Sequence, residues 1–263
     1  MGILEGKVAI VLGASAPGGS GWAIARRFAE EGAKLVVGAR SEGPLQELAR
    51  LTGGIAQACD VAKEDEVQAL VARASDAFGG LDVAVNAAGL PMGGTIANAP
   101  IEDARAAMEV NYFGCVHFIR HSAAAMKNGG SIVLFSSLAA AQPMEFVYAY
   151  GCAKAATDCL VRYAAIEYGP KGIKVNSIMP GPIRSDMASG LWAVSGMEEA
   201  YVREIPLRRI GEPEDYADAA LWLAGPSFVN GVNLHISGGN HLMRMPTLDE
   251  RPDMVGPDPT NAA

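Results

Sequence analysis

Tyr150 and Lys154 stand four positions apart at the start of a helical pattern that continues to Tyr168. Residues at this spacing project from one face of a helix, so the phenol and the ammonium are expected to lie together. A phenol, with a pKa of about 10, is a poor base at neutral pH, but a nearby ammonium favours the phenolate and lowers that pKa. The pair could therefore transfer a proton, although the same spacing also occurs by chance in ordinary helices.

Further polar residues stand near the expected ends of strands. Ser137 directly follows one expected strand, and Asn111 lies inside an expected helix, where a buried amide requires hydrogen-bond partners. The runs Asn86–Gly89 and Pro180–Ser185 follow two further strands. Open α/β sheets bind ligands at the carboxyl ends of their strands, so we expect these segments to meet at one site.

A glycine-rich segment, residues 13–21, lies between the first expected strand and a helix beginning near Trp22. Glycines allow a sharp turn and a close approach of the backbone to a pyrophosphate, and the free N–H groups of a helix N-terminus attract that anion. A tight structural turn is the alternative explanation. The order strand, glycine loop, helix favours a dinucleotide site.

The end of the second expected strand bears on the choice of dinucleotide. NAD-binding folds usually carry an acid there, about 20 residues after the loop, for the ribose 2′-hydroxyl. Here Ala39 stands at that place and Arg40 follows, and a guanidinium can pair with a 2′-phosphate. The sequence favours NADP(H), with NAD(H) possible if Arg40 is only a solvated loop residue. Asp60 and Val61, past the third strand, could contact the adenine.

Short apolar, β-branched runs alternate along the chain with longer helical patterns. Such runs are typical of strands covered on both faces. Repeated βα units predict a single-domain, Rossmann-like doubly wound parallel sheet of about seven strands, with helices on both faces. The expected strands are Val8–Leu12, Lys34–Gly38, Ile55–Ala58, Val83–Asn86, Ser131–Ser136, Lys174–Ile178 and Val232–Ile236, and the expected helices include Trp22–Glu31, Glu64–Phe78, Ile101–Met126 and Tyr150–Tyr168.

Two regions depart from this alternation. Residues 185–209 are rich in Met, Trp and Leu, and the tail from His241 is rich in proline. We expect one dinucleotide-binding domain over residues 1–240, with a substrate lobe near 185–209. The tail at 241–263 is expected to be either an ordered arm or a loose end.

Composition disfavours several classes of protein. Half of the 263 residues are apolar and 19% are charged, as in a globular domain with a large core. The net charge of −8 disfavours a nucleic-acid partner. We see no signal-peptide pattern and no apolar run near the ~18 residues that span a bilayer, so we expect a soluble cytoplasmic protein with no membrane partner. The cysteines lack metal-like spacing with histidine, so we expect no metal site and small apolar roles for Cys59, Cys115, Cys152 and Cys159.

The joint pattern is far more specific than its parts. From about Gly6 to Gly239 the chain resembles the short-chain dehydrogenase/reductase family. The resemblance rests on the glycine loop, Asp60, Asn86-Ala-Ala-Gly89, Asn111, Ser137, Tyr150-x-x-x-Lys154 and Pro180-Gly181. It implies an enzyme that moves a hydride between a nicotinamide ring and a secondary alcohol or ketone.

The resemblance also implies residue roles. Tyr150 would be the general acid or base, and Ser137 would hydrogen-bond the substrate oxygen. Lys154 would bind the nicotinamide ribose and lower the pKa of Tyr150, while Asn111 would hold a proton-relay water. The expected dinucleotide contacts are Gly13, Ser15, Gly19, Ser20, Gly21, Arg40, Asp60, Val61, Asn86, Ala88, Gly89, Tyr150, Lys154, Pro180, Gly181, Ile183 and Ser185.

Several residues depart from the family pattern. Leu12 replaces the usual Thr before the first glycine, and Ala87 replaces the second Asn of the common Asn-Asn-Ala-Gly run. The glycine loop is two residues longer than usual, with Pro17 inside it. These changes affect the way the pyrophosphate is held and leave the reaction type unchanged.

The substrate is the least specified feature. Met144 and Trp192 are expected to contact the substrate, and they favour a bulky apolar molecule such as a steroid, terpenoid or aromatic ketone. Other apolar residues could line the same space or equally pack the core or a subunit interface. These are Phe146 and Tyr148 before the catalytic tyrosine, and Met187, Leu191 and Met197 in the lobe.

Three alternatives remain open. A 3-oxoacyl carrier-protein reductase would use the same residues. An enoyl reductase is disfavoured, because its tyrosine stands seven positions before the lysine, where this chain has Val147. A non-catalytic dinucleotide-binding scaffold would have no need for the full residue set. Members of the family are usually tetramers, so we expect a homotetramer with Ile101–Met126 and Tyr150–Tyr168 at one interface.

Overall fold

The computed structural model describes residues 2–185, 188–247 and 250. Within these residues, seven strands form one parallel sheet in the order β3-β2-β1-β4-β5-β6-β7. The doubly wound parallel sheet predicted from the sequence is confirmed. The strands are β1 (Val8–Leu12), β2 (Lys34–Ala39), β3 (Ile55–Ala58), β4 (Val83–Asn86), β5 (Gly130–Phe135), β6 (Ile173–Pro180) and β7 (Asn233–Ile236).

The predicted strand bounds differ from these by one or two residues at most. β1, β3 and β4 begin and end where the sequence placed them. β6 is the most extended relative to its prediction, because its pairing with β7 continues as far as Pro180. Element ends are set by the last ladder hydrogen bond, which composition alone does not locate.

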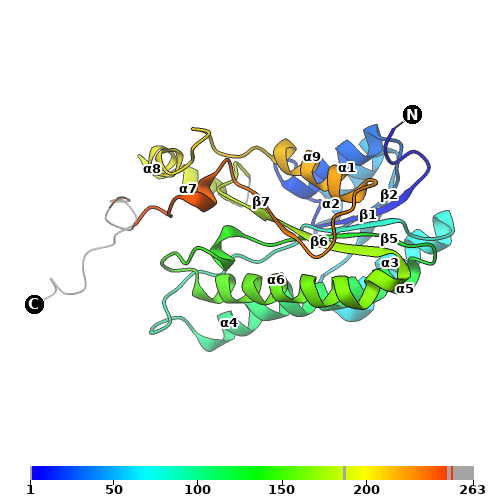
Figure 1. Cartoon of the computed structure of the whole chain (residues 1–263), viewed down its shortest axis with the longest axis horizontal. Helices are drawn as coiled ribbons and strands as arrows, with labels where there is room; N and C mark the ends of the chain where they lie inside the picture. The colour runs from blue at the N-terminus through cyan, green and yellow to red at the C-terminus, as the bar shows by residue number, and fades with distance from the viewer. Residues whose placement is uncertain (1, 186–187, 248–249, 251–263) are drawn as a thin grey trace, which may run out of the picture.

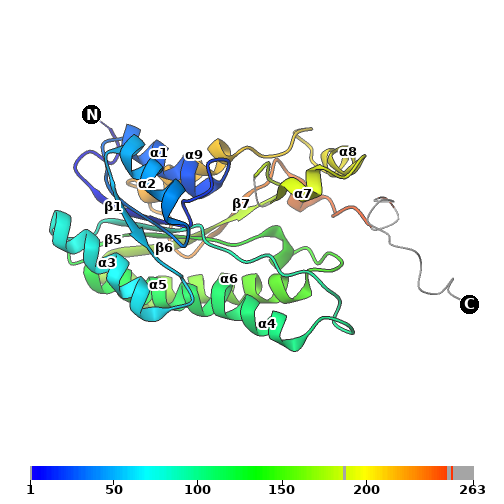
Figure 2. The ribbon, with the colours of Figure 1, turned by 180° about the vertical axis from the view of Figure 1, so that it is seen from behind.

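Helices cover both faces of the sheet (Figure 1 and Figure 2). A smaller lobe, with the two short helices α7 and α8, stands beyond one end of the sheet. No described helix is both long enough and apolar enough to cross a membrane. One layer holds α1 (Ser20–Glu30), α2 (Glu42–Thr52) and α9 (Pro213–Ala224), the other α3 (Glu64–Phe78), α4 (Ile101–Met108), α5 (Gly114–Ala125) and α6 (Tyr148–Tyr168), and the lobe α7 (Ser189–Trp192) and α8 (Met197–Arg203).

Two apolar cores lie on opposite faces of the sheet. Successive strand residues point to opposite faces, so Ala9 and Val11 enter one core while Ile10 and Leu12 enter the other. All four are buried. This double burial explains why the strands read as continuous apolar runs, and it fixes the strand ends from which the site is built.

The predicted helix Ile101–Met126 is wrong as a single α-helix. A five-residue π-helical turn, Glu109–Phe113, separates α4 from α5. The backbone carbonyl of Asn111 accepts a hydrogen bond from Thr157 Oγ1 at 2.6 Å. The helix widens where this side-chain donor from α6 meets its backbone, and such π-turns often mark functional sites.

Candidate active site

The glycine loop follows β1 and packs against the end of β4. Gly13 has a φ of +86°, and a Cβ there would collide with the backbone nitrogen of Ala88. A Cβ at Gly21 would collide with the carbonyl of Gly13. Both positions require glycine, because only the bare backbone permits this closeness. α1 then begins at Ser20, with no side chain capping its first turn.

A cavity opens between this loop and the ends of β2, β3 and β4. Seven of the predicted dinucleotide contacts line it: Gly13, Ser15, Arg40, Asp60, Val61, Ala88 and Gly89. Gly19, Ser20, Gly21 and Asn86 are not among its lining residues. Its place, where the strand order reverses between β1 and β4, is where doubly wound sheets bind ligands.

Two cavity residues differ in how firmly they are held. Arg40 is exposed and forms no ion pair with any acid in the described part of the chain. Asp60 is held by its own turn, since its Oδ1 accepts from the backbone N–H of Ala62 at 3.1 Å. Beside Asp60, burial raises the pKa of the Cys59 thiol to about 12, so this cysteine stays protonated.

Asn86 supports the cavity wall from behind. It is 1% exposed, and its Oδ1 accepts from the backbone N–H of Ala88 at 3.0 Å. Its Nδ2 lies 3.6 Å from the sulfur of Cys115, whose pKa is raised by burial. The Asn86 side chain therefore stabilises the turn formed by Ala87–Gly89.

Tyr150, Lys154 and Ser137 come together from α6 and the end of β5. Lys154 is 2% exposed, and its ammonium donates to the carbonyl of Phe135 at 2.7 Å and lies 5.6 Å from the centre of the Tyr150 ring. Ser137 Oγ accepts from the backbone N–H of Ala139 at 3.2 Å. The predicted spacing on one helix face is what brings the phenol and the ammonium together.

Asn111 joins this group from the π-turn. Its side chain pairs with both backbone groups of Leu90, accepting from N–H at 3.2 Å and donating to C=O at 3.0 Å. A Cβ at Gly89 would lie 3.4 Å from Asn111 Oδ1 and 3.7 Å from Lys154 Nζ. The side-chain amide of Asn111 is therefore hydrogen-bonded to the loop that borders the dinucleotide cavity.

A second cavity begins at Tyr150 and Ser137. Its lining carries no charged side chain among the described residues, and it includes Met144 and Trp192, the two substrate contacts predicted from the sequence. The lining consists of Pro91, Ser137, Leu138, Ala139, Met144, Val147, Tyr150, Pro180, Gly181, Pro182, Ile183, Ser185, Ala188, Leu191, Trp192, Tyr201 and Met245.

Some of the wider set of apolar candidates lie elsewhere. Phe146 is 42% exposed, and Tyr148 packs beside Ala149, away from this lining. Met197 is buried in the core of the lobe, and Met187 lies outside the described residues. Hydrophobic composition alone does not separate a cavity wall from a core.

Sequence reasoning missed several residues of the cavity wall, among them Tyr201 and Met245. Tyr201 could have been found from the helical spacing of Met197 and Tyr201, which places both on the inner face of α8. Met245 carries no comparable signal, because it lies in a segment without regular structure.

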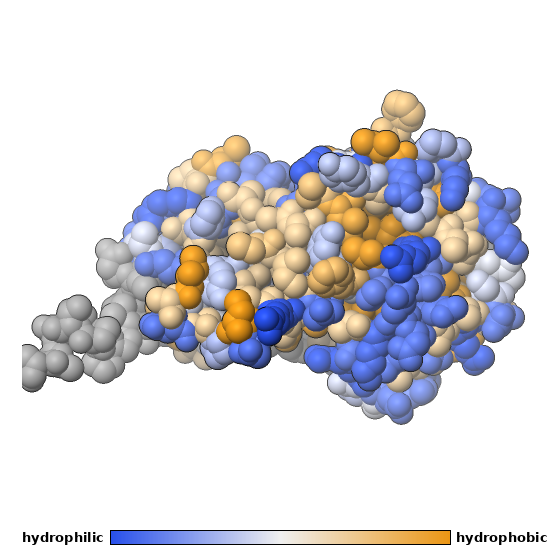
Figure 3. Space-filling model, turned by 90° about the horizontal axis from the view of Figure 1, so that it is seen from below, coloured by the Kyte–Doolittle hydropathy of each residue, from blue (hydrophilic) through white to orange (hydrophobic). Residues whose placement is uncertain are grey.

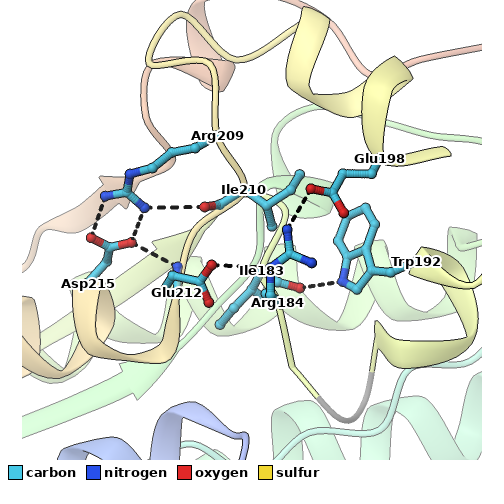
Figure 4. Close-up of polar contacts among 8 residues, drawn as sticks. All are labelled: Ile183, Arg184, Trp192, Glu198, Arg209, Ile210, Glu212 and Asp215. Atoms are coloured by element: carbon cyan, nitrogen blue, oxygen red, sulfur yellow. Dashed lines mark hydrogen bonds and ion pairs between the residues drawn. The ribbon is translucent and has the colours of Figure 1, made fainter. Parts of the chain in front are cut away.

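Polar contacts hold the lobe against the sheet (Figure 4). The indole nitrogen of Trp192 donates to the carbonyl of Ile183 at 2.9 Å, so the ring is fixed as a cavity wall. Arg184 pairs with Glu198 of α8 at 2.6 Å and with Glu212 before α9 at 3.2 Å. The orientation of the lobe is therefore set by contacts to the segment after β6 and to the residue before α9.

Comparisons with known proteins agree with this geometry. A family model described as enoyl-(acyl carrier protein) reductase matches residues 13–241. The chain is 38% identical to the 7alpha-hydroxysteroid dehydrogenase of Escherichia coli (strain K12) over 245 residues, which cover 90% of this chain and 94% of the relative. The chain belongs to the short-chain dehydrogenase/reductase family. It is therefore an oxidoreductase acting on CH–OH or carbonyl groups with a nicotinamide dinucleotide.

Other short-chain dehydrogenases show how far the likeness extends. A solved short-chain type dehydrogenase/reductase from Mycobacterium ulcerans superposes with a TM-score of 0.88 at 32% identity, covering 94% of each chain. The glucose 1-dehydrogenase of Gluconobacter oxydans (strain 621H) is 35% identical over 249 residues, which cover 89% of this chain and 91% of the relative. Since relatives of similar identity are named for a steroid and for a sugar, identity alone does not select the substrate.

Proposed function

We propose that the protein is an NADP(H)-dependent dehydrogenase of a bulky, uncharged, apolar secondary alcohol, or a reductase of the corresponding ketone. The observation that carries this proposal is the position of Tyr150 and Ser137. Both face a cavity whose described lining has no charge, next to the cavity bordered by the glycine loop. A lining without charge among the described residues disfavours carboxylate or phosphate substrates, which would lose hydration there without gaining a partner.

The dinucleotide fits the residues present. The bare backbone at Gly13 leaves room for the pyrophosphate near the uncapped first turn of α1. Arg40, which pairs with no acid among the described residues, offers its guanidinium for a 2′-phosphate. Asp60 and Val61 would flank the adenine, and Ile183 and Ser185 the carboxamide. When bound, the nicotinamide supplies or takes up the hydride.

Ser137 and Lys154 each keep a hydrogen-bond donor that no described residue occupies. Ser137 Oγ already accepts from Ala139, so its own proton is left to donate to the substrate oxygen. One of three Lys154 N–H groups binds Phe135, which leaves two for the ribose and for the side of Tyr150. Tyr150 would then give a proton to the ketone oxygen, or take one from the alcohol, with the neighbouring ammonium stabilising its phenolate.

Proton supply is proposed to pass along the π-turn at Asn111. The Asn111 side chain is bound to Leu90, and its backbone carbonyl accepts from Thr157 Oγ1 and from the weak donor Cys115 Sγ, so a relay water would bind at that carbonyl in place of the thiol. The buried ammonium of Lys154 lies on the same side of Gly89.

An enoyl reductase is the second candidate, because the matching family model carries that description. The residues disfavour it: Val147 stands seven positions before Lys154, and Tyr148 lies outside the cavity. An enoyl substrate would also be presented as a thioester, so reduction of an enoyl thioester and of a 3-oxoacyl thioester are direct counter-assays.

The deciding experiment compares Tyr150→Phe with Tyr148→Phe. Loss of the Tyr150 hydroxyl should lower kcat for a cyclic apolar secondary alcohol by at least about a hundredfold, the usual contribution of a positioned acid or base. Binding of NADPH, followed by nicotinamide fluorescence, should change little. Tyr148→Phe removes the same hydroxyl two residues earlier and should retain activity.

Three results would contradict the proposal. Full activity of Tyr150→Phe would remove the assigned acid or base. Loss of activity in Tyr148→Phe together with turnover of an enoyl thioester would favour the enoyl reductase. NADPH binding without turnover of any alcohol, ketone or thioester would favour a non-catalytic scaffold.

We also propose that the protein assembles as a homotetramer through the α4–α6 side. Figure 3 shows apolar side chains gathered along the middle of this face. Tyr163 and Ile166 of α6 are 70% and 78% exposed, and Phe113 of the π-turn is 42% exposed. Contiguous exposed apolar surface of this kind is typical of protein interfaces.

A further inference from the structure

We infer that residues 240–247 form a strap that closes the substrate cavity, and that Met245 in this strap is a specificity-determining residue. The inference rests on the proposed function, because it assigns a wall of the same site. The strap includes the first residues of the proline-rich tail, whereas residues 248–249 and 251–263 of that tail lie outside the described residues.

Met245 reaches the cavity from a segment outside the regular fold. It lines the same cavity as Tyr150 and Trp192, and it packs against the lobe core around Tyr201. Its side chain is partly buried, whereas its strap neighbours Leu242 and Met243 are 75% and 51% exposed. A methionine here presents a flexible apolar surface that can adapt to the shape of a substrate.

The strap is fastened to the lobe at Glu204, the residue after α8. The Glu204 side chain is only 9% exposed, and its carboxylate pairs with Arg244 Nη2 at 3.1 Å. Asn240, which is fully buried, donates from Nδ2 to the Glu204 carbonyl at 2.9 Å. A buried carboxylate without its cation would be costly, so the pair favours the closed position of the strap.

A second fastening joins the strap to the loop before α6. Gln142, in the loop before α6, donates from Nε2 to the carbonyls of Asn240 at 3.3 Å and Met243 at 3.2 Å. The strap therefore bridges the lobe and the loop that leads to Tyr150. Because the strap spans two walls of the cavity, Met245, its residue in the cavity lining, limits the size and shape of the substrate.

The first test varies the strap residues. Met245→Ala should change the ratio of kcat/KM for a fused-ring secondary alcohol to that for a small one, such as 2-butanol, by about tenfold or more, since an apolar wall contacts only the larger substrate. Leu242→Ala, on the exposed side of the strap, should leave the ratio within about twofold of the wild type. Equal ratios in Met245→Ala and Leu242→Ala would overturn the assignment of Met245.

The second test follows the strap without using activity. In Glu204→Gln, hydrogen exchange of the strap amides that close its turn should accelerate by at least about tenfold, while the amides of β1 and β4 keep their protection. These strap amides are Asn240, Leu242 and Met243. Unchanged exchange in the strap would overturn the fastening at Glu204.

The two tests separate failure of the inference from failure of the proposed function. If the wild-type protein turns over no alcohol or ketone, the proposed function fails, and with it the assignment of Met245. The exchange measurement still decides whether the strap is fastened. If the wild type is active, and Met245→Ala keeps its substrate ratio while Glu204→Gln keeps its exchange rates, only the strap inference is overturned.

Discussion

At the scale of single residues, Arg40 is the clearest case of a side chain whose surroundings suggest a ligand. Its guanidinium is exposed at the end of β2, lines the dinucleotide cavity, and pairs with no acid of the described chain. An acid at this point would bind a ribose hydroxyl, whereas a free guanidinium suits a phosphate.

Replacing Arg40 with alanine should weaken NADPH binding by about tenfold or more, as expected for a lost hydrogen bond to a charged group. NADH binding should change little, because NADH lacks the 2′-phosphate. Fluorescence titration with each dinucleotide at fixed salt measures both. Arg50→Ala, on the exposed last turn of α2, removes the same charge away from the cavity and serves as the control. Equal weakening of both dinucleotides by Arg40→Ala would contradict the assignment.

At the scale of elements, the start of α9 anchors the lobe through one carboxylate. Asp215 accepts from both terminal nitrogens of Arg209, at 2.6 and 2.7 Å, and from the backbone N–H of Glu212 at 2.8 Å. The hydrogen bonds from Arg209 are the largest cause holding the pKa of Asp215 below its usual value. The charged form is therefore the one that the fold stabilises.

Asp215→Asn should lower the free energy of unfolding by about 1 kcal/mol at pH 7, the size of one hydrogen bond. Because the folded-state pKa is lowered, the contribution of the carboxylate is fully present above the unfolded value of about 3.9. It is lost as the pH falls through the lower folded-state pKa, so the two stability curves should converge in acid. Urea unfolding between pH 3 and 7 measures this.

The control for this pH dependence is Asp218→Asn on the same helix. Asp218 pairs with Arg27 but its side chain is 71% exposed, so the change should have little effect at any pH. A constant difference between wild type and Asp215→Asn across the pH range would show that the carboxylate is not the titrating group.

Elements also show where sequence reasoning succeeded. Strands buried on both faces leave a strong apolar signal, and β1, β3 and β4 were located to the residue. The break at Asn111 left no such signal, because the sequence of α4 and α5 remains compatible with one helix while the contact that widens it comes from Thr157 on α6. Contacts between elements that are distant in sequence leave no signal in the local pattern of apolar and polar residues.

In the candidate site too, local spacing predicted some residues, whereas contacts between distant segments determine others. Motif spacing predicted the meeting of Ser137, Tyr150 and Lys154, since each is fixed by one strand end or one helix face. Met245 was not predicted, because the path of an irregular segment depends on partners such as Glu204 and Gln142. The sequence had also suggested an apolar role for all four cysteines, whereas Cys152 and Cys159 are exposed on α6.

At the scale of the whole molecule, exposed apolar side chains on the α4–α6 side bear on the proposed assembly. Ile166 and Tyr163 gain nothing from exposure to water, and burial of such side chains against a second copy is favourable. A closed symmetric assembly would cover these side chains on every subunit.

Ile166→Glu should shift the protein to a smaller assembly, because a carboxylate would be buried unpaired at the interface. Light scattering after size-exclusion chromatography gives the mass. Leu51→Glu on α2, in the other helix layer and 53% exposed, introduces the same charge and should leave the mass unchanged. An Ile166→Glu protein of wild-type mass would place the interface elsewhere.

Helix α6 connects the candidate catalytic residues to the proposed subunit interface. This single helix of 21 residues, roughly 31 Å long, carries Tyr150 and Lys154 on its first two turns and Ile166 near its last. If a neighbouring subunit orders the C-terminal end of α6, the N-terminal end with Tyr150 and Lys154 is also more ordered before the dinucleotide binds. Thermodynamic reciprocity then requires the converse, that dinucleotide tightens the association of subunits, so dilution and ligand concentration would act on the same equilibrium.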